Sequence, residues 1–314
     1  MLTYTIRRLL SLAVSLVLIS LLIFTVMRII PGDPAQMMLG TEAEPETLEI
    51  LRDKLGLDEP LFVQYFSWVR GVLTANLGDS LRYNVPISGL ISSRLLVTAP
   101  LAVIATLLSV LVGVPAGLYA GTHRNQIGDY GVMIFSQIGL AVPAFWFGIL
   151  LMLIFAVQLN WFSAGGFIPW TESVFGAFKS LILPAIALGI IRAAVIARLS
   201  RSALLEVLHH DYIRTARSKG LVEHVILYKH ALRNALIPII TIIGMQFAAL
   251  LAGTIIIENV FYLPGLGRLA FQAISQRDFP VVQDIVLLIA VMVVGMNLLV
   301  DLTYMFLDPR IRLE

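Results

Sequence analysis

Six long apolar runs are the feature that most constrains the fold of this 314-residue chain. Each is close to the roughly 20 residues that an α-helix needs to cross the hydrocarbon core of a bilayer. Only 13% of the residues are charged, against about 25% in soluble domains. We therefore expect an all-α, polytopic membrane protein with six transmembrane helices, in which residues 1–314 form a single domain. The expected spans are Leu9–Ile30, Ala99–Ala120, Val132–Val157, Leu181–Leu199, Leu236–Ile257 and Val282–Leu307.

The Lys and Arg residues in the short loops predict how these spans are oriented, because cytoplasmic loops carry an excess of both. With the N-terminus inside, twelve cations fall in cytoplasmic segments and three in short outer loops. Both termini are therefore expected in the cytoplasm. The twelve are Arg7, Arg8, Arg124, the seven between Arg198 and Arg233, Arg310 and Arg312, and the three are Lys179, Arg268 and Arg277.

Residues 31–97 are expected to form a helical insert outside the cytoplasm. Pro45–Leu55 has a proline in its first turn, leucines on one face and a glycine directly after its end, a pattern typical of a short helix. Pro60–Leu73 repeats the helical spacing. Tyr65 and Trp68 in this second helix fit a position at the lipid headgroups. A packed cap without lipid contact fits the same pattern equally well.

Between the fourth and fifth runs lies a polar segment, Arg198–Arg233, which we call the basic region. It holds seven of the 22 Lys and Arg residues and three acids, a net charge of +4 with neutral His. Asp211 is expected to cap a short helix that begins at Tyr212, and Gly220 is expected to end it. A second helix is expected from Val222. Such an element suits a groove in a soluble partner, and a loop that binds anionic lipid is an equal alternative.

The stretch YIRTARSKGLVEHVILYKHALRNALIP, Tyr212–Pro238, resembles the EAA loop of permease subunits of binding-protein-dependent ABC importers. Of the general pattern only Ala216, Gly220 and Leu232 are present, and the departures resemble the peptide/nickel branch, which reads Y-x-R-T-A-R-x-K-G and H-A-L-R-N-A. The resemblance to the B-type permease of that branch covers nearly the whole chain. The further segments that carry it, in order, are RRLLSLAVSLVLISLLIFTVMRIIPGDPA, LGLDEPLFVQY, IIIENVFYLPGLGRLAFQAISQRDFPVVQ and NLLVDLTYMFLDPRIR.

This resemblance implies a type I ABC importer permease, with residues 31–97 as an extracytoplasmic insert and 200–233 as the EAA or coupling loop. The implied location is the bacterial inner membrane, and the implied cargo is a di- or oligopeptide. The implied partners are a paralogous C-type permease subunit, two cytoplasmic ABC ATPase subunits, an extracytoplasmic substrate-binding protein and membrane lipid.

The chain has no G-x-x-x-x-G-K-[ST] motif, which cradles nucleotide phosphates in ATPases. We therefore expect no catalytic residue and no cofactor on this chain, with ATP and Mg²⁺ held by the ATPase subunits. By resemblance, the short helix of the basic region couples the permease to an ATPase cleft. The implied coupling residues are Asp211, Tyr212, Ile213, Arg214, Thr215, Ala216, Arg217, Ser218, Lys219 and Gly220.

Polar residues within or next to the spans are candidates for the pathway or gate, because charged residues in membrane helices are functional candidates by default. Glu258, at the outer boundary, faces a substrate ammonium or pairs with Arg268 or Arg277, and we favour the ion pair. Asp301 is expected to pair with Arg198 rather than to bind substrate. The four candidates are Glu258, Asn259, Arg192 and Asp301.

The sequence gives little support for a metal as cargo. All five histidines lie in expected cytoplasmic loops and the chain has no cysteine, so a naked transition metal finds no good ligands along the spans and no metal site is expected. Chelated nickel, glutathione or another small peptide-like solute stays an alternative to peptides. A secondary transporter is the alternative of another class, although no internal repeat supports it. A net charge of +2 gives no reason to expect nucleic acid as a partner.

Overall fold

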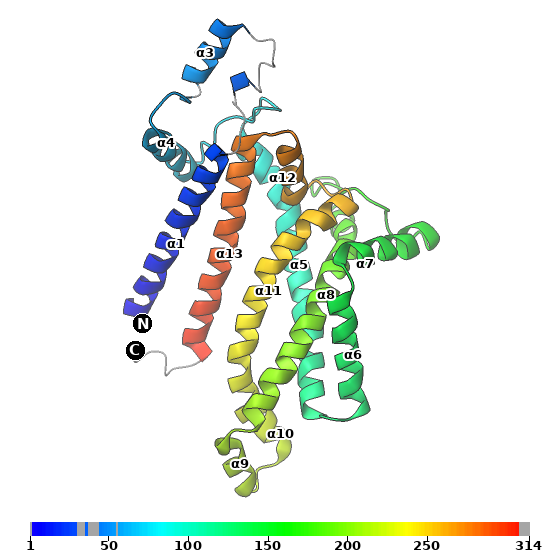
Figure 1. Cartoon of the computed structure of the whole chain (residues 1–314). Coiled ribbons are helices and arrows are strands. Elements are labelled where there is room, and N and C mark those ends of the chain that lie inside the picture. Colours follow the sequence, from blue (N-terminus) through cyan, green and yellow to red (C-terminus); the bar gives the residue numbers. More distant parts are fainter. Residues whose placement is uncertain (1, 30–34, 37–43, 55, 308–314) are drawn as a thin grey trace.

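The computed structural model describes residues 2–29, 35–36, 44–54 and 56–307, and helices dominate it (Figure 1). Within these ranges no β-strand forms. The described ends of α1 and α13 that are nearest the two termini lie at the same end of the bundle as α9 (Figure 1). The elements are α1 (Leu2–Ile29), α3 (Pro45–Lys54), α4 (Leu61–Leu73), α5 (Ile87–Thr122), α6 (Ile127–Ala141), α7 (Ala144–Leu151), η1 (Met152–Gln158), α8 (Val174–Leu208), α9 (Asp211–Ser218), α10 (Glu223–Val225), η2 (Ile226–Ala231), α11 (Leu232–Val260), α12 (Leu266–Ser275) and α13 (Phe279–Leu307).

Five helices of the described part are long and apolar enough to cross a membrane. They are α1, α5, α8, the continuous helix Glu223–Val260 and α13, and they coincide with five of the six expected spans. Several extend beyond the apolar run; α5 has 36 residues. Ile30, which ends the first expected span, and the cations Arg310 and Arg312 lie outside the described residues. The expected all-α, polytopic architecture is confirmed.

The third expected span, Val132–Val157, is not one continuous helix. α6 and the segment formed by α7 and η1 meet at an angle of 101°. Val142 and Pro143 between them are extended, with ψ of 122° and 135°, and a residue before proline is disfavoured in the helical conformation. As a result, α7 runs sideways from the bundle rather than along it (Figure 1).

The helices α5 and α8 form the centre of the bundle through a close backbone approach. Gly113, Gly117 and Gly121 lie four residues apart on α5 and are buried. A Cβ atom on Gly113 would lie 2.6 Å from the carbonyl oxygen of Ala193, and one on Gly121 would lie 2.9 Å from the Leu204 side chain. In lipid, small residues at this spacing allow the backbone contact that holds two helices together.

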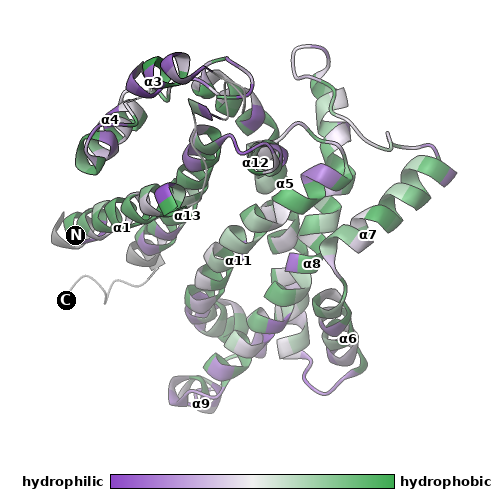
Figure 2. Ribbon diagram, turned by 45° about the horizontal axis from the view of Figure 1, so that its top comes forward, coloured by the Kyte–Doolittle hydropathy of each residue, from purple (hydrophilic) through white to green (hydrophobic). Residues whose placement is uncertain are grey.

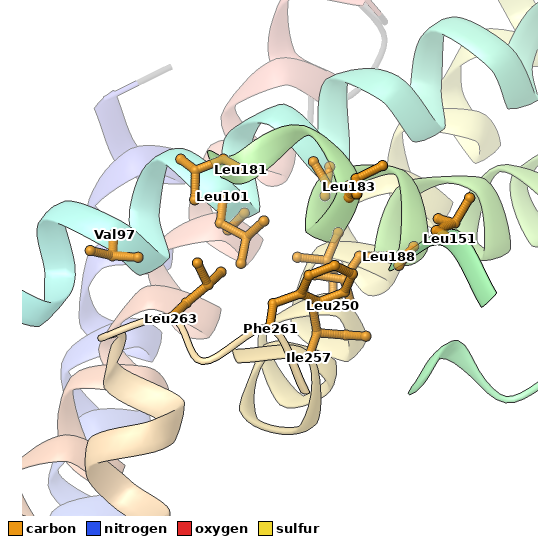
Figure 3. Close-up of a cluster of buried hydrophobic side chains, with 14 of the residues drawn as sticks. Val97, Leu101, Leu151, Leu181, Leu183, Leu188, Leu250, Ile257, Phe261 and Leu263 are labelled. Atoms are coloured by element: carbon orange, nitrogen blue, oxygen red, sulfur yellow. The ribbon is translucent and has the colours of Figure 1, made fainter. Parts of the chain in front are cut away.

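The largest apolar cluster lies at the end of this helix pair that is opposite α9 (Figure 3). Leu101 of α5, Leu181 of α8 and Ile257 of α11 are fully buried in it. Phe261 and Leu263, from the turn that follows α11, enter the same cluster (Figure 3). This cluster therefore fixes the turn that follows α11 against three of the spans.

The spans consist mostly of apolar residues, as the green parts of the ribbons of α1, α11 and α13 show in Figure 2, and many of these side chains are exposed. On α1, Leu10, Leu18 and Leu22 are each at least 60% exposed. Polar residues gather instead on short elements at the ends of the bundle, such as α9 (Figure 2). Exposed apolar surface of this extent marks contact with a membrane or a partner.

Both expected outer helices are present, as α3 and α4, although Leu55 lies outside the described residues. α4 packs on the outer ends of α1 and α13. The hydroxyl of Tyr65 lies 2.9 Å from the hydroxyl of Ser20, and the indole of Trp68 donates to Asp284 at 2.8 Å. The polar groups of both rings thus bind protein, which favours the packed cap over a headgroup position for these two side chains.

Candidate functional site

The basic region is a folded extension of the bundle rather than a loop. Its first part belongs to α8, which continues to Leu208. After α9 the chain forms one continuous helix from Glu223 to Val260, through α10, η2 and α11. The second helix expected from Val222 is therefore confirmed, with Val222 as its N-cap residue.

Two side chains on one face anchor α9. Ile213 is fully buried and Ala216, three residues on, is 5% exposed. They pack in an apolar cluster with Leu204 and Val207 of α8 and with Ile226 of the following helix. α9 is therefore fixed to two spans at once.

The N-terminal end of α9 differs from the sequence prediction. Asp211 is the first helical residue rather than the cap, since His210 occupies the cap position and no side chain caps this end. The carboxylate of Asp211 lies instead 3.5 Å from the guanidinium of Arg214, one turn further along. Both side chains of this pair are mostly exposed, so it contributes little stability.

The C-terminal end of α9 is as predicted. Gly220 has a φ of +76°, in the left-handed region that glycine adopts without strain. Its N–H donates to the carbonyl of Arg217 at 2.9 Å, and the N–H of Leu221 donates to the carbonyl of Ala216 at 3.4 Å. A Cβ atom on Gly220 would meet nothing within 4 Å. Any strain from a side chain here thus comes from the backbone conformation and not from a clash.

The face of α9 that points away from the bundle is cationic. Arg214, Arg217 and Lys219 are all exposed there. Arg217 donates to Glu223 at 2.6 Å, and this hydrogen bond raises the pKa of the guanidinium above its ordinary value. The pair joins the end of α9 to the start of the next helix and so orients the cationic face.

Exposed apolar side chains lie at both ends of α9, a feature that sequence reasoning missed. Tyr212 is at its start and Leu221 and Val222 follow its end; they are 40%, 40% and 57% exposed. The hydroxyl of Tyr212 accepts a hydrogen bond from Asn234 at 2.8 Å. A cationic face next to exposed apolar side chains is typical of a surface that meets a partner. The signal in the sequence is the apolar pair directly after Gly220.

One cation of the basic region is held inside the bundle. Arg201 of α8 donates to Asp129 of α6 at 2.7 Å, and the Asp129 side chain is 3% exposed. The backbone N–H of Asn125 donates to the same carboxylate at 3.0 Å. This pair ties α6 to α8 near the end of the bundle that carries α9. The sequence did not predict it, because the two residues are 72 positions apart.

At the opposite end, Glu258 organises the turn between α11 and α12. It is fully buried. One of its carboxylate oxygens accepts from the Thr98 hydroxyl of α5 at 2.6 Å, and the other accepts from the backbone N–H of Arg268 at 3.0 Å. Thr98 in turn accepts from the N–H of Leu266 at 2.8 Å. The carboxylate thus caps the first turn of α12, where free N–H groups favour a negative charge.

The expected ion pair between Glu258 and the side chain of Arg268 or Arg277 is wrong. Arg268 reaches the carboxylate through its main chain, and its guanidinium lies 5.3 Å from the centroid of the Tyr262 ring. No ion pair of Glu258 occurs among the residues that the structure describes. The backbone of Gly265 lies so close to the Glu258 carboxylate that a Cβ atom at this position would overlap it.

Arg192 and Asn259 make structural contacts. Arg192 of α8 donates to the carbonyl of Ala249 at 2.9 Å and to the side chain of Gln246 at 3.3 Å, both on α11. Asn259 donates to the carbonyl of Ile255 in its own helix at 2.7 Å. Arg192 thus adds a polar link to the contact between α8 and α11.

Asp301 pairs with Arg8 of α1, at 2.9 Å. The expected pair with Arg198 is wrong, because α13 packs against α1 and α11, whereas Arg198 lies on α8. The interaction therefore connects the first and last spans.

These polar groups serve helix ends and contacts between helices. The described part of the chain holds no group of three or more His, Cys, Asp or Glu side chains that could bind a metal ion. These polar contacts instead hold together the helices that run between α9, at one end of the bundle, and the turn capped by Glu258, at the other.

A bundle of apolar spans with an anchored, exposed helix at one end and a capped turn at the other defines a polytopic membrane protein. Residues 113–313 match the family described as "Binding-protein-dependent transport system inner membrane component". Residues 1–102 match the family of the N-terminal part of such components. The chain belongs to this family of transport-system permeases.

Relatives with named cargoes span the whole chain. The dipeptide transport system permease protein DppB of Alkalihalophilus pseudofirmus is 41% identical and covers 99% of this chain and 100% of that protein. The glutathione transport system permease protein GsiC of Salmonella choleraesuis is 40% identical and covers 99% of both. Among solved structures, the inward-facing MetNI methionine ABC transporter matches with a TM-score of 0.55 and 17% identity. It covers 70% of this chain and 96% of that chain, and it shows the shared fold.

Proposed function

We propose that this chain is the B-type permease subunit of an ATP-driven, binding-protein-dependent importer of di- or oligopeptides in a bacterial inner membrane. It forms half of the translocation pathway beside a paralogous C-type subunit. Two cytoplasmic ATPase subunits hold the ATP and Mg²⁺, and an extracytoplasmic binding protein delivers the peptide. Both termini are cytoplasmic. The observation that carries the proposal is α9, an exposed cationic helix anchored to two spans at once.

Residues 211–220 dock in an ATPase cleft and pass its closure to the spans. Ile213 and Ala216 connect α9 to α8 and to the helix Glu223–Val260. That helix has 38 residues, about 57 Å at the usual rise, and Glu258 stands near its far end. A displacement of α9 therefore reaches the outer turn, and access to the pathway switches from outside to inside.

The proposed cargo follows from the relatives. The two named cargoes, a dipeptide and glutathione, are both peptides, which supports a peptide as the substrate of this chain. Glutathione itself, chelated nickel or another small peptide-like solute is the alternative within the same architecture. Membership of the permease family speaks against the secondary transporter.

The test is the ATPase activity of the assembled complex in nanodiscs, with its binding protein loaded by di-, tri- or longer peptides, or by a nickel chelate. We expect stimulation by one class of peptide. Stimulation by the nickel chelate alone would overturn the peptide while leaving the importer intact. Failure of the chain to assemble with ATPase subunits would overturn the importer itself.

A matched pair of variants tests the coupling helix. Gly220→Asp places a negative charge beside the cationic face of α9, and we expect at least a tenfold loss of peptide-stimulated ATPase activity. Gly220→Asn has nearly the same shape without the charge, and Asn tolerates positive φ, so we expect most of the activity to remain. Normal transport by the Gly220→Asp variant would contradict docking through α9.

A further inference from the structure

A cavity of about 460 Å³ lies between α4 and the outer ends of α1 and α13. Its volume is within the range of small-molecule sites. Its wall includes the buried Asp284, the aromatic rings of Phe24 and Trp68, and the side chains of Arg28 and Gln64. None of the coupling or gate residues described above contributes to it.

Asp284 is a buried acid without a cation. It is 5% exposed and accepts one hydrogen bond, from the neutral indole of Trp68 at 2.8 Å. No ion pair of Asp284 occurs among the described residues. A buried carboxylate that lacks a counter-charge is costly, and a charged group inside a membrane helix is a candidate for a functional site.

Gln64 is a second polar residue of the wall. Its amide nitrogen donates to the carbonyls of Leu57 and Glu59, at 3.0 and 2.7 Å, which fixes the orientation of the amide. The amide oxygen is buried and has no hydrogen-bond partner. Because this oxygen has almost no accessible surface, Gln64 shapes the wall of the cavity without offering an acceptor to a ligand.

The charges and rings of the wall define the ligand further. Among the described residues of the lining, Arg28, Glu59 and Asp284 are charged and sum to −1. The guanidinium of Arg28 lies 5.2 Å from the centroid of the Phe24 ring, and aromatic faces also attract an ammonium. The described wall therefore offers one buried carboxylate to a cation and one guanidinium to an anion.

We propose that this cavity binds a zwitterionic ligand whose primary ammonium is received by Asp284 and whose anionic group is received by Arg28. Two sources carry this chemistry. One is a short peptide with free termini, which rests on the proposed function. The other is the headgroup of phosphatidylethanolamine, because the cavity adjoins the outer ends of two membrane helices.

The two sources are distinguished with the assembled transporter in nanodiscs, without ATP. Calorimetric titration compares trialanine with N-acetyl-trialanine, which lacks the ammonium. Native mass spectrometry compares the retention of phosphatidylethanolamine, phosphatidylcholine and phosphatidylglycerol. Phosphatidylcholine is the sharp control, since it keeps the positive charge but has no N–H group to donate to Asp284. If the ligand is a peptide, we expect trialanine to bind and N-acetyl-trialanine not to bind. If the ligand is a lipid, we expect only phosphatidylethanolamine of the three lipids to be retained.

Asp284→Asn keeps an acceptor for Trp68 and removes the charge. We expect this substitution to lower the affinity for the ligand about 10- to 100-fold, the usual effect of losing a charged hydrogen bond. Glu172→Gln, which removes an exposed acid before α8, should change nothing. If the Asp284 variant fails to assemble, Arg28→Gln provides the test and should weaken the same ligand.

The proposal is overturned if neither source binds, or if both Asp284→Asn and Arg28→Gln leave binding unchanged. Because binding is measured without turnover, its failure leaves the proposed transport function standing. Conversely, a complex that binds phosphatidylethanolamine but is stimulated by no peptide supports the cavity and contradicts the cargo.

Discussion

The two ends of the bundle are stabilised in opposite ways. α9 is held by apolar side chains and keeps its charged groups outside, whereas the turn before α12 is held by a buried carboxylate with its donors inside. Apolar contacts are not directional, so the packing of Ile213 and Ala216 tolerates small displacements of α9. A satisfied buried network specifies one arrangement. This difference fits the proposed roles, in which α9 docks on an ATPase subunit and the turn before α12 keeps one defined arrangement.

The largest expected effect is at the outer turn. Glu258→Ala removes the carboxylate and leaves the Thr98 hydroxyl and the Arg268 N–H without an acceptor. Since each unsatisfied buried group costs about 1–3 kcal/mol, we expect a loss of about 3–5 kcal/mol in the free energy of unfolding. The measurement is the thermal unfolding midpoint of the purified complex.

Asn259→Ala is the control for this variant, since the adjacent side chain bonds only within its own helix. It should leave the midpoint nearly unchanged. Equal midpoints for the two variants would show that the Glu258 network does not hold the turn.

A smaller and local effect is expected at α9. Ile213→Ala empties a fully buried position in the cluster that anchors this helix. Such truncations cost about 2–5 kcal/mol. We expect hydrogen exchange in residues 211–220 to become faster, while exchange at the turn before α12 stays unchanged.

Leu221→Ala, at a position that is 40% exposed, should leave exchange in α9 as it is. Faster exchange at both ends of the bundle after Ile213→Ala would mean that the two ends are not stabilised independently.

The sequence predicted most elements of the fold because apolar runs and helix-ending residues act locally. Five spans, the outer helices and the end of α9 at Gly220 all follow from such patterns. The break in the third span also has a local cause, at Pro143. It was missed because the apolar composition continues through it.

The side-chain partners were not predictable in this way. Asp301 pairs with Arg8 rather than Arg198 because the order in which helices pack decides which charges meet. Glu258 bonds with Thr98, which is 160 positions away in the sequence, and Arg201 bonds with Asp129, which is 72 positions away. Glu258 and Asp301 stand out in the sequence as charges within or beside apolar runs, but only the packed bundle shows which groups they contact.

The smallest effect on stability is expected from Arg217→Gln, which separates docking from folding at the α9 end. The Arg217–Glu223 pair has side chains that are 46% and 55% exposed, and exposed pairs contribute about 0–1 kcal/mol. The unfolding midpoint should therefore hardly move.

If the cationic face of α9 meets an acidic cleft, peptide-stimulated ATPase activity of the Arg217→Gln variant should fall and become less sensitive to ionic strength, because salt screens exposed charges. Arg70→Gln, on the exposed side of α4, should change neither quantity. If the salt dependence is unchanged in Arg217→Gln, the partner contacts α9 through the exposed apolar side chains Tyr212, Leu221 and Val222 rather than through its charge.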